Sequence, residues 1–219
     1  MSSEVAGRKR REFLPAAGHD LLLPLYDPLV SLLGGDRARR ELINQARIED
    51  NHHVLDVGCG TGTLVILLKK QHPTIEVAGL DPDIKALRRA KMKATRAAVS
   101  LQFNQGFADE LPYQEGSFDR ILSSFMFHHL EEEDREKMLR ETLRVMKSGG
   151  SLHLVDFKGD HGSHGLLGRL IHSSHRLKNN SEEHILQLMK RAGFSQARKI
   201  KDGSMFFGAL KTSYFEASA

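Results

Sequence analysis

The sequence has little of what marks a secreted or membrane protein. It holds one cysteine, Cys59, in 219 residues, so no disulfide can form within the chain, and a reducing compartment is the simple expectation. No apolar run is long enough to span a bilayer, and the first residues carry no apolar signal core. These absences predict a cytoplasmic protein without stable membrane insertion.

No sign of charge dominates either. The formal net charge is +4, and the densest basic run lies at residues 8–11, near the amino terminus. Such a run is typical of a solvated tail, with weak contact to a membrane or a nucleic acid as the alternative. The other values, 40% hydrophobic and 27% charged residues, predict one globular α/β domain with a sizeable core.

The strongest pattern is an apolar strand that runs into a glycine-rich turn. Residues 53–57 are rich in valine and leucine, as expected of an interior parallel strand. Gly58, Gly60 and Gly62 follow at alternate positions, which suits a turn with unusual backbone angles and space for a ligand against bare backbone. A turn of this kind at the start of a helix predicts a small-ligand site.

The spacing of this turn separates two kinds of nucleotide ligand. A dinucleotide fingerprint has its third glycine at the position that Thr63 occupies here. Asp56, two residues before the first glycine, would repel a pyrophosphate but could pair with a cationic amino-acid end. Both features disfavour a nicotinamide oxidoreductase. Either Thr61 or Thr63 is expected to cap the helix at 62–71.

Strands and helices are predicted to alternate along most of the chain. Strands are expected at 53–57, 75–80, 101–103, 118–124, 151–157, 197–201 and 205–212, and helices at 19–33, 37–46, 62–71, 84–97, 132–146 and 182–192. The last two strands are expected to turn at Asp202-Gly203. Residues 158–180, rich in glycine and histidine, predict a lid insertion; because no cysteine cluster accompanies the histidines, no metal site is expected.

Two acidic residues follow later strands at positions suited to a nucleoside. Asp81 ends the second strand about twenty residues past the turn, where a carboxylate can accept from both ribose hydroxyls. Pro82 then opens the next helix. Asp109 follows the third strand and could accept from an adenine amino group, while Phe107 and Ala108 could lie along the adenine face.

Five motifs in this order resemble those of the class I S-adenosylmethionine-dependent methyltransferases. They occupy residues 54–62, 79–81, 106–109, 118–121 and 143–150. The segment 127–130 is most similar to the subgroup with ubiquinone and menaquinone biosynthesis C-methyltransferases. The resemblance implies a three-layer, doubly wound α/β fold with a mostly parallel seven-stranded sheet in the order 3-2-1-4-5-7-6. It implies a methyltransferase domain at 49–219, with a tail and cap helices at 1–48.

The same resemblance implies S-adenosylmethionine as the methyl donor and S-adenosylhomocysteine as the product. The glycines would approach the methionine half of the cofactor, and Asp56 would help to hold its amino end. The full set of implied cofactor-binding residues is Asp56, Gly58, Cys59, Gly60, Thr61, Gly62, Asp81, Pro82, Phe107, Ala108, Asp109 and Ser124. Cys59 is expected to be a small side chain that faces the ligand or the core, not a nucleophile.

Methyl transfer needs alignment and exclusion of water, and some acceptors must also lose a proton. His128 and His129 follow the fourth strand and are the first candidates for a general base. Asp156, at the tip of the fifth strand, is the second. Tyr26, Phe127 and His128 are expected to contact the substrate.

Absent motifs narrow the acceptor. The segment after the fourth strand lacks the Asn/Asp-Pro-Pro pattern of amino-methylating enzymes, and no Pro-Cys nucleophile is present for cytosine. The sequence therefore predicts a small, apolar or aromatic acceptor methylated at O, N or C, with no nucleic acid partner. An RNA methyltransferase and a non-catalytic S-adenosylmethionine-binding protein are the alternatives, and the oligomeric state is left open.

Overall fold

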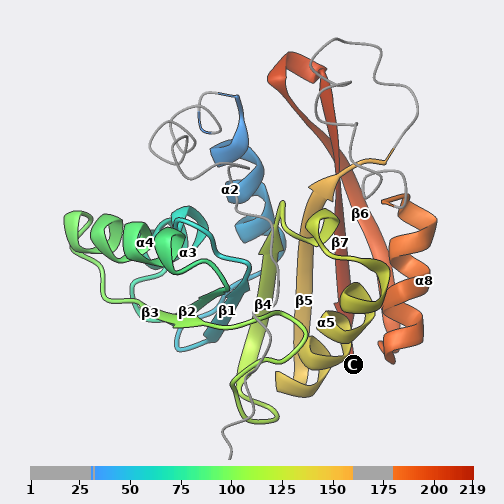
Figure 1. Ribbon diagram of the computed structural model, residues 1–219, viewed down its shortest axis with the longest axis horizontal. Coiled ribbons are helices and arrows are strands. Elements are labelled where there is room, and N and C mark those ends of the chain that lie inside the picture. The colour runs from blue at the N-terminus through green and yellow to red at the C-terminus, as the bar shows by residue number, and fades with distance from the viewer. Residues whose placement is uncertain (1–30, 32, 160–179) are drawn as a thin grey trace, which may run out of the picture.

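The computed structural model describes residues 31, 33–159 and 180–219. Residues 1–30, 32 and 160–179 lie outside the described part of the chain, drawn in grey in Figure 1. Nearly all of the helical segment expected at 19–33, the substrate residue Tyr26 and nearly all of the lid expected at 158–180 therefore fall outside the description.

A seven-stranded sheet forms the centre of the molecule (Figure 1). Its order is β3-β2-β1-β4-β5-β7-β6, as the resemblance implies, and β7 runs antiparallel to both β5 and β6. The strands are β1 (His53–Val57), β2 (Glu76–Asp81), β3 (Gln102–Gln105), β4 (Phe118–Ser124), β5 (Met146–Phe157), β6 (Gln196–Met205) and β7 (Leu210–Ser218). The apolar run of β1 is buried on both faces because helices cover both sides of the sheet.

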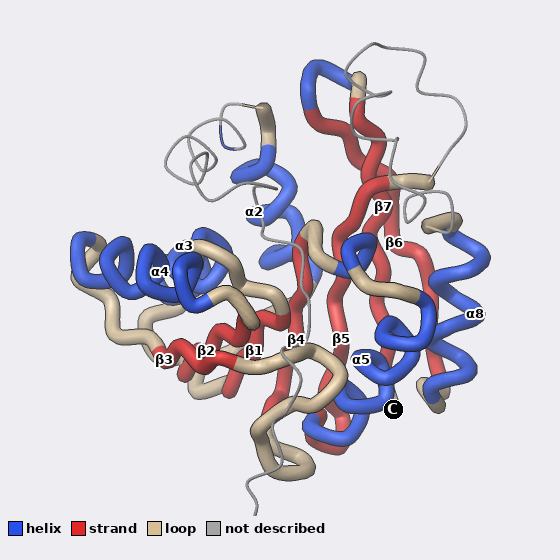
Figure 2. Tube along the Cα trace, viewed as in Figure 1, coloured by secondary structure: helices blue, strands red, loops and turns tan. Residues whose placement is uncertain are grey.

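Helices cover the two faces and make the fold three-layered (Figure 2). One face packs against α2 (Gly35–Gln45), α3 (Thr63–Gln71) and α4 (Ile84–Arg96). The other packs against α5 (Glu132–Val145), α8 (Glu182–Ala192) and the short η2 (Phe127–His129). None of the helices in the described residues is both long and apolar enough to cross a bilayer.

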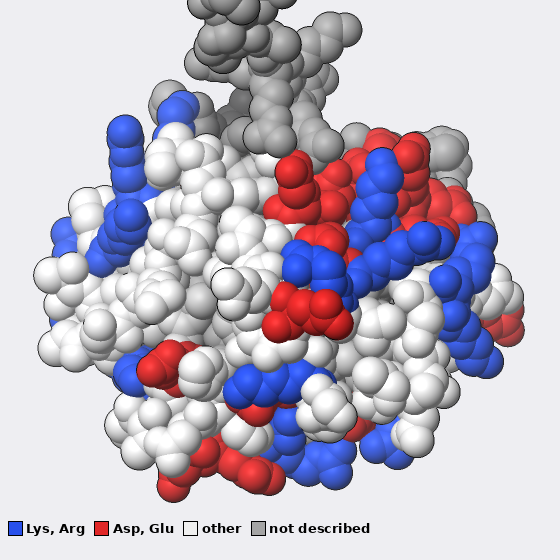
Figure 3. Space-filling view, turned by 90° about the horizontal axis from the view of Figure 1, so that it is seen from below, with Lys and Arg blue, Asp and Glu red and all other residues white. Residues whose placement is uncertain are grey.

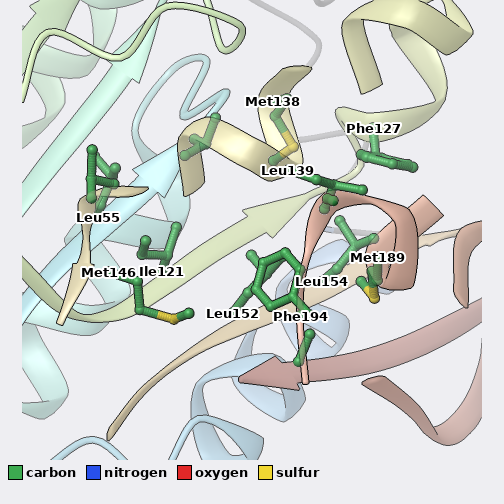
Figure 4. Packing of buried hydrophobic residues seen from close by; sticks show 14 of the residues in the cluster. Leu55, Ile121, Phe127, Met138, Leu139, Met146, Leu152, Leu154, Met189 and Phe194 are labelled. Carbon is green, nitrogen blue, oxygen red and sulfur yellow. The ribbon is translucent and has the colours of Figure 1, made fainter. Parts of the chain in front are cut away.

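Each face has its own apolar core, and Figure 4 shows the one beneath α5 and α8. Leu55 of β1 and Leu154 of β5 are fully buried there, against Met138 and Leu139 of α5 and Met189 of α8. The interior strands therefore lie between two close-packed apolar layers. This packing holds the strands, and hence their ends, in fixed positions.

The carboxyl ends of the parallel strands meet at one edge of the sheet. The register pairs Val57 with Leu80 across β1 and β2, and Ser124 with Val155 across β4 and β5. Residues that follow these four strands are consequently neighbours. Figure 3 views the opposite edge, where lysine and arginine are intermixed with aspartate and glutamate.

The expected threonine cap of α3 is wrong. Gly62 is the N-cap, with φ of 76°, and no side chain makes a capping hydrogen bond. The Oγ1 atom of Thr63 instead accepts from Lys93 Nζ at 2.7 Å. Gly62 adopts the left-handed conformation that the tight turn requires. The threonine side chains are therefore not needed as caps, and they contact α4 instead.

The expected turn at Asp202-Gly203 is also wrong. Both residues lie inside β6, with Gly203 paired to Thr212, and the chain reverses at η3 (Phe206–Gly208). A Cβ on Gly203 would lie 2.7 Å from Thr212 Oγ1, so this glycine permits close packing of the two strands instead of a turn. Asp202 accepts from Lys199 Nζ at 2.8 Å.

Candidate active site

The glycine turn after β1 is pinned to the end of β2. The backbone N–H groups of Gly58 and Cys59 both donate to the Leu80 carbonyl, at 2.8 and 3.0 Å. Gly60 and Gly62 have φ of 52° and 76°, in the left-handed region that side chains disfavour. The turn is therefore a rigid loop whose backbone faces the carboxyl edge of the sheet.

The three glycines serve different purposes. A Cβ on Gly58 would lie 2.3 Å from Met126, and a Cβ on Gly62 would lie 2.8 Å from Ala90, so both are needed for packing. A Cβ on Gly60 would have no atom within 4 Å. Gly60 is thus the glycine beside which a ligand has room to lie against bare backbone.

Asp81 joins this loop to the start of α4. Its Oδ2 accepts from Gly60 N at 2.8 Å, and its Oδ1 accepts from Asp83 N at 2.9 Å. Burial raises the pKa of Asp81 to about 6, although the two N–H donors act in the opposite direction. The carboxylate lies at the tip of β2, as the sequence predicts, and it also holds the loop in shape.

Asp56 on β1 has a buried carboxyl group that lacks a hydrogen-bond donor among the described residues. It is 1% exposed, and neither of its oxygens has a hydrogen-bond partner among the described residues. Burial raises its pKa to about 7, with the Arg39 guanidinium opposing this and Asp81 adding to it. An unpaired buried acid is costly, so the site fits a cationic ligand group.

Arg39 of α2 is a site residue that the sequence reasoning missed. It is 8% exposed and falls on the inward stripe of α2 with Ala38 and Leu42, which is the signal that could have revealed it. Its guanidinium carbon lies 5.9 Å from the centre of the Phe125 ring, and its Nη1 lies 3.2 Å from Asp36 Oδ1. A buried cation thus stands near the carboxyl end of β1.

His128 and Asp156, expected as separate candidates, form one pair. The Oδ1 atom of Asp156 lies 2.6 Å from His128 Nδ1, and Oδ2 accepts from the His128 backbone N–H at 2.7 Å. The Phe157 N–H is a third donor, at 2.7 Å. Burial alone would raise the pKa of Asp156, but His128 and these backbone donors outweigh it and hold the pKa below its ordinary value.

This pairing decides the tautomer of the imidazole. An ionised Asp156 can only accept, so His128 Nδ1 must be the donor. The lone pair of the neutral ring then lies on Nε2, which makes that atom a proton acceptor. The ring is packed 4.0 Å from the His129 ring and 5.3 Å from the Phe157 ring, between centroids.

Phe127 does not reach the site. Its side chain is 0% exposed, and it packs beside Leu139 in the core under α5 (Figure 4). The Arg135 guanidinium covers the ring at 5.3 Å. The expectation that Phe127 contacts the substrate is therefore corrected: the 3₁₀ turn of η2 directs it inward and leaves His128 at the sheet edge.

The other expected residues lie along the same edge. Ser124 ends β4 and is half-buried, and Pro82 accepts through its carbonyl from Gln105 Nε2 at 3.1 Å. The loop after β3 holds the half-buried residues Phe107, Ala108 and Asp109. Thr61 is buried, and its Oγ1 accepts a hydrogen bond from Lys93 Nζ at 3.3 Å.

Cys59 is buried in the glycine turn, and burial raises its pKa well above the ordinary thiol value. A thiol that stays protonated is a poor nucleophile. Among the described residues, no group of three histidine, cysteine, aspartate or glutamate side chains is arranged to hold a metal.

Comparison with solved structures establishes the class of fold. An S-adenosylmethionine-dependent methyltransferase from Aquifex aeolicus superposes with a TM-score of 0.64 at 20% identity, over 81% of this chain and 88% of that one. At this identity the likeness is one of fold.

Comparison of sequences establishes the family. A methyltransferase domain model matches residues 54–150. A demethylmenaquinone methyltransferase from Thermus thermophilus is 35% identical over 68% of this chain and 69% of its own length. One from Deinococcus radiodurans is 37% identical over 62% of this chain, which spans 57% of that relative's length. The chain belongs to the class I S-adenosylmethionine-dependent methyltransferases.

Proposed function

We propose that this chain transfers a methyl group from S-adenosylmethionine to a small hydroxylated aromatic molecule of the quinol type. The observation that carries the cofactor assignment is Asp56, whose buried oxygens have no partner among the described residues and lie at the glycine turn. The α-ammonium group of the cofactor is the donor that this carboxyl lacks. When bound, S-adenosylmethionine supplies an activated methyl group on a sulfonium.

Neighbouring residues complete the proposed cofactor site. Gly60 leaves room for the methionine half, and Asp81, already held by two backbone donors, offers its remaining lone pairs to the ribose hydroxyls. Asp109 and the side chains of Phe107 and Ala108 would face the adenine. The cationic Arg39 near Asp56 is suited to the cofactor's carboxylate.

The His128–Asp156 pair supports a reaction that removes a proton. Nε2 of His128 is the proton acceptor, and ionised Asp156 stabilises the imidazolium that forms. Deprotonation of a ring hydroxyl raises the electron density at the adjacent ring carbons. The similar demethylmenaquinone methyltransferases support a quinone-derived ring, and a similar ubiquinone/menaquinone biosynthesis C-methyltransferase from Geobacter supports methylation at carbon.

Calorimetry with S-adenosylmethionine, S-adenosylhomocysteine and NADH tests the cofactor site. We expect both adenosyl ligands to bind and NADH not to bind. Asp81→Ala should weaken binding by about tenfold or more, because loop order and ribose contacts are lost together. Asp119→Ala is the matched control, since Asp119 is paired with Lys147 at the opposite edge of the sheet. Equal effects of the two substitutions would contradict the assigned site.

A second experiment tests the acceptor. The protein is incubated with methyl-labelled S-adenosylmethionine and short-chain hydroquinones, and the products are analysed by mass spectrometry. We expect label on a ring carbon, and no product from acceptors whose hydroxyls are blocked. Tight cofactor binding without any labelled product would favour the alternative of a non-catalytic binding protein.

A further inference from the structure

The β6–β7 hairpin ends in a tip that presents a bare aromatic ring. Phe207 in η3 is 106% exposed, whereas Met92, the next most exposed of the large apolar residues described, is 54% exposed. Its neighbour Phe206 is half-buried and packs against the core beneath α2. An aromatic ring held wholly in water forgoes the favourable burial that such rings usually find.

The backbone of the tip holds this ring outward. Phe206, Phe207 and Gly208 have φ of 54°, 53° and 95°, three successive residues in the left-handed region. The first two are strained there because they carry side chains. The Phe206 N–H donates to the Leu33 carbonyl at 2.9 Å, and the Ala209 N–H donates to the Phe206 carbonyl at 3.1 Å. The backbone conformation of the tip and these two hydrogen bonds thus hold the Phe207 side chain in solvent.

The tip stands beyond the candidate active site, at the same edge of the sheet. Asp156 pairs with Ser213 of β7, and β7 begins three residues earlier, at Leu210. Three strand residues span about 10 Å, so Phe207 projects at least that far past the His128–Asp156 pair. Figure 1 shows the hairpin rising above the ends of β4 and β5, beside α2.

The base of the hairpin carries an ion-paired network with a small excess of lysine and arginine. A cleft of about 640 Å³ lies between α2 and the two strands. Its charged lining consists of Arg37, Lys158, Lys201 and Lys211 with Glu41 and Asp202. Arg37 and Lys201 pair with Glu41, and Lys158 pairs with Glu182 and Asp202. Lys199 joins the same network through Glu182 and Asp202, so five cations stand against three acids and the excess is two positive charges. An aromatic tip above a cationic surface is the combination that binds the headgroup region of anionic bilayers.

We propose that the hairpin tip, residues 206–209, docks on an anionic lipid bilayer, with Phe207 in the headgroup region and the cations of the cleft towards the lipid phosphates. One ring on four residues is too small for a protein interface, which needs about 800 Å² on each partner. Docking would turn the active-site edge towards a membrane-dissolved acceptor, and it involves no membrane span.

The sequence supplies a clean reporter, because it contains no tryptophan. The Phe207→Trp variant therefore has a single fluorescent indole at the tip, and Met92→Trp on α4 is the matched control. Each is mixed with vesicles of phosphatidylcholine and phosphatidylglycerol at about 3:1, with and without brominated acyl chains. For the tip variant we expect a blue shift, quenching by bromine, and loss of both in high salt. The control should show none of these.

Sedimentation with the same vesicles gives the second readout. Phe207→Ser should lower the partition coefficient by about tenfold or more, since the exposed ring contributes only to docking, and Met92→Ser should leave it unchanged. Three results would overturn the proposal: no spectral shift with vesicles, sedimentation without a shift, or a shift that grows with protein concentration in the absence of lipid. The last would assign the tip to a second copy of the chain. No cofactor is present, so these outcomes are independent of methyl transfer.

Discussion

Replacing Asp56 by asparagine should make the protein more stable and a weaker binder. Asp56 is 1% exposed, and burial raises its pKa from 3.8 to about 7. Below pH 3.8 the carboxyl is neutral in both the folded and unfolded states and costs nothing. Between pH 3.8 and 7 the unfolded chain ionises first, so folding stability falls. Above pH 7 the loss is complete, at most about 4 kcal/mol.

Asp56→Asn removes this loss, because an amide has no charge to desolvate. The free energy of unfolding of the variant should exceed that of the native protein by about 2–4 kcal/mol at pH 8, and by little at pH 4. The same change deletes a charge-assisted bond to the cofactor's ammonium, so the Kd for S-adenosylmethionine should rise by about 10- to 100-fold. Native affinity should itself increase with pH up to about 7.

Urea unfolding at several pH values and calorimetry on the same samples measure both effects. Asp119→Asn is the control: this carboxyl accepts from Lys147 Nζ and the His53 N–H, both at 2.8 Å, and its pKa lies below the ordinary value. Its loss should destabilise the protein and leave cofactor affinity unchanged. The reasoning is refuted if Asp56→Asn lowers stability at pH 8, or if it leaves the Kd at its native value.

Two further predictions concern the base and the glycine turn. Asp156→Asn should reduce single-turnover methyl transfer by about 10²–10⁴, because His128 loses the partner that fixes its tautomer, while cofactor affinity stays within about twofold. The Asp156 pKa lies below 3.8, so its stabilising effect is complete above that pH and is lost on further acidification. Gly62→Ala should lower the free energy of unfolding by about 1–3 kcal/mol, since its Cβ would meet Ala90. Gly60→Ala should cost about 1 kcal/mol and weaken cofactor binding about tenfold.

Each of these has a contradicting result. Equal single-turnover rates for Asp156→Asn and the native protein would exclude the His128 pair from the reaction. The glycine reasoning predicts opposite rankings for stability and affinity. Gly62→Ala should be the less stable variant, and Gly60→Ala should be the weaker binder. If urea unfolding and calorimetry find that one variant is both less stable and weaker in binding, the cofactor does not lie in the open space beside Gly60.

Local sequence patterns were sufficient for the five parallel strands and the position of the glycine turn, but the strand expected at 205–212 begins only at Leu210. The valine and leucine run of β1, the alternate glycines and the acid at the end of β2 are each signals within a few residues, and hydrophobic period and turn chemistry act at that range. The order of the sheet followed from the resemblance carried by five such motifs together.

Turn details failed where a neighbouring strand overruled the local signal. Asp202-Gly203 has the composition of a hairpin turn, yet pairing with Thr212 continues through it, and the chain reverses at a pair of phenylalanines. A composition rule describes what a segment can adopt alone. Burial of Met205 and the hydrogen bond from Phe206 to Leu33 decide what it adopts here.

The sequence by itself determined which residues stand at the carboxyl edge of the sheet: Asp56, Asp81, His128 and Asp156 each lie near or just past the end of a predicted strand. Only the tertiary structure decided how they combine. It joined His128 to Asp156 across 28 residues, directed Phe127 into the core, and brought Arg39 of α2 near Asp56. These contacts depend on strand register and helix docking, which are set by packing of the whole domain; the local sequence can place Arg39 on the inward stripe of α2, but it cannot show which residue Arg39 meets.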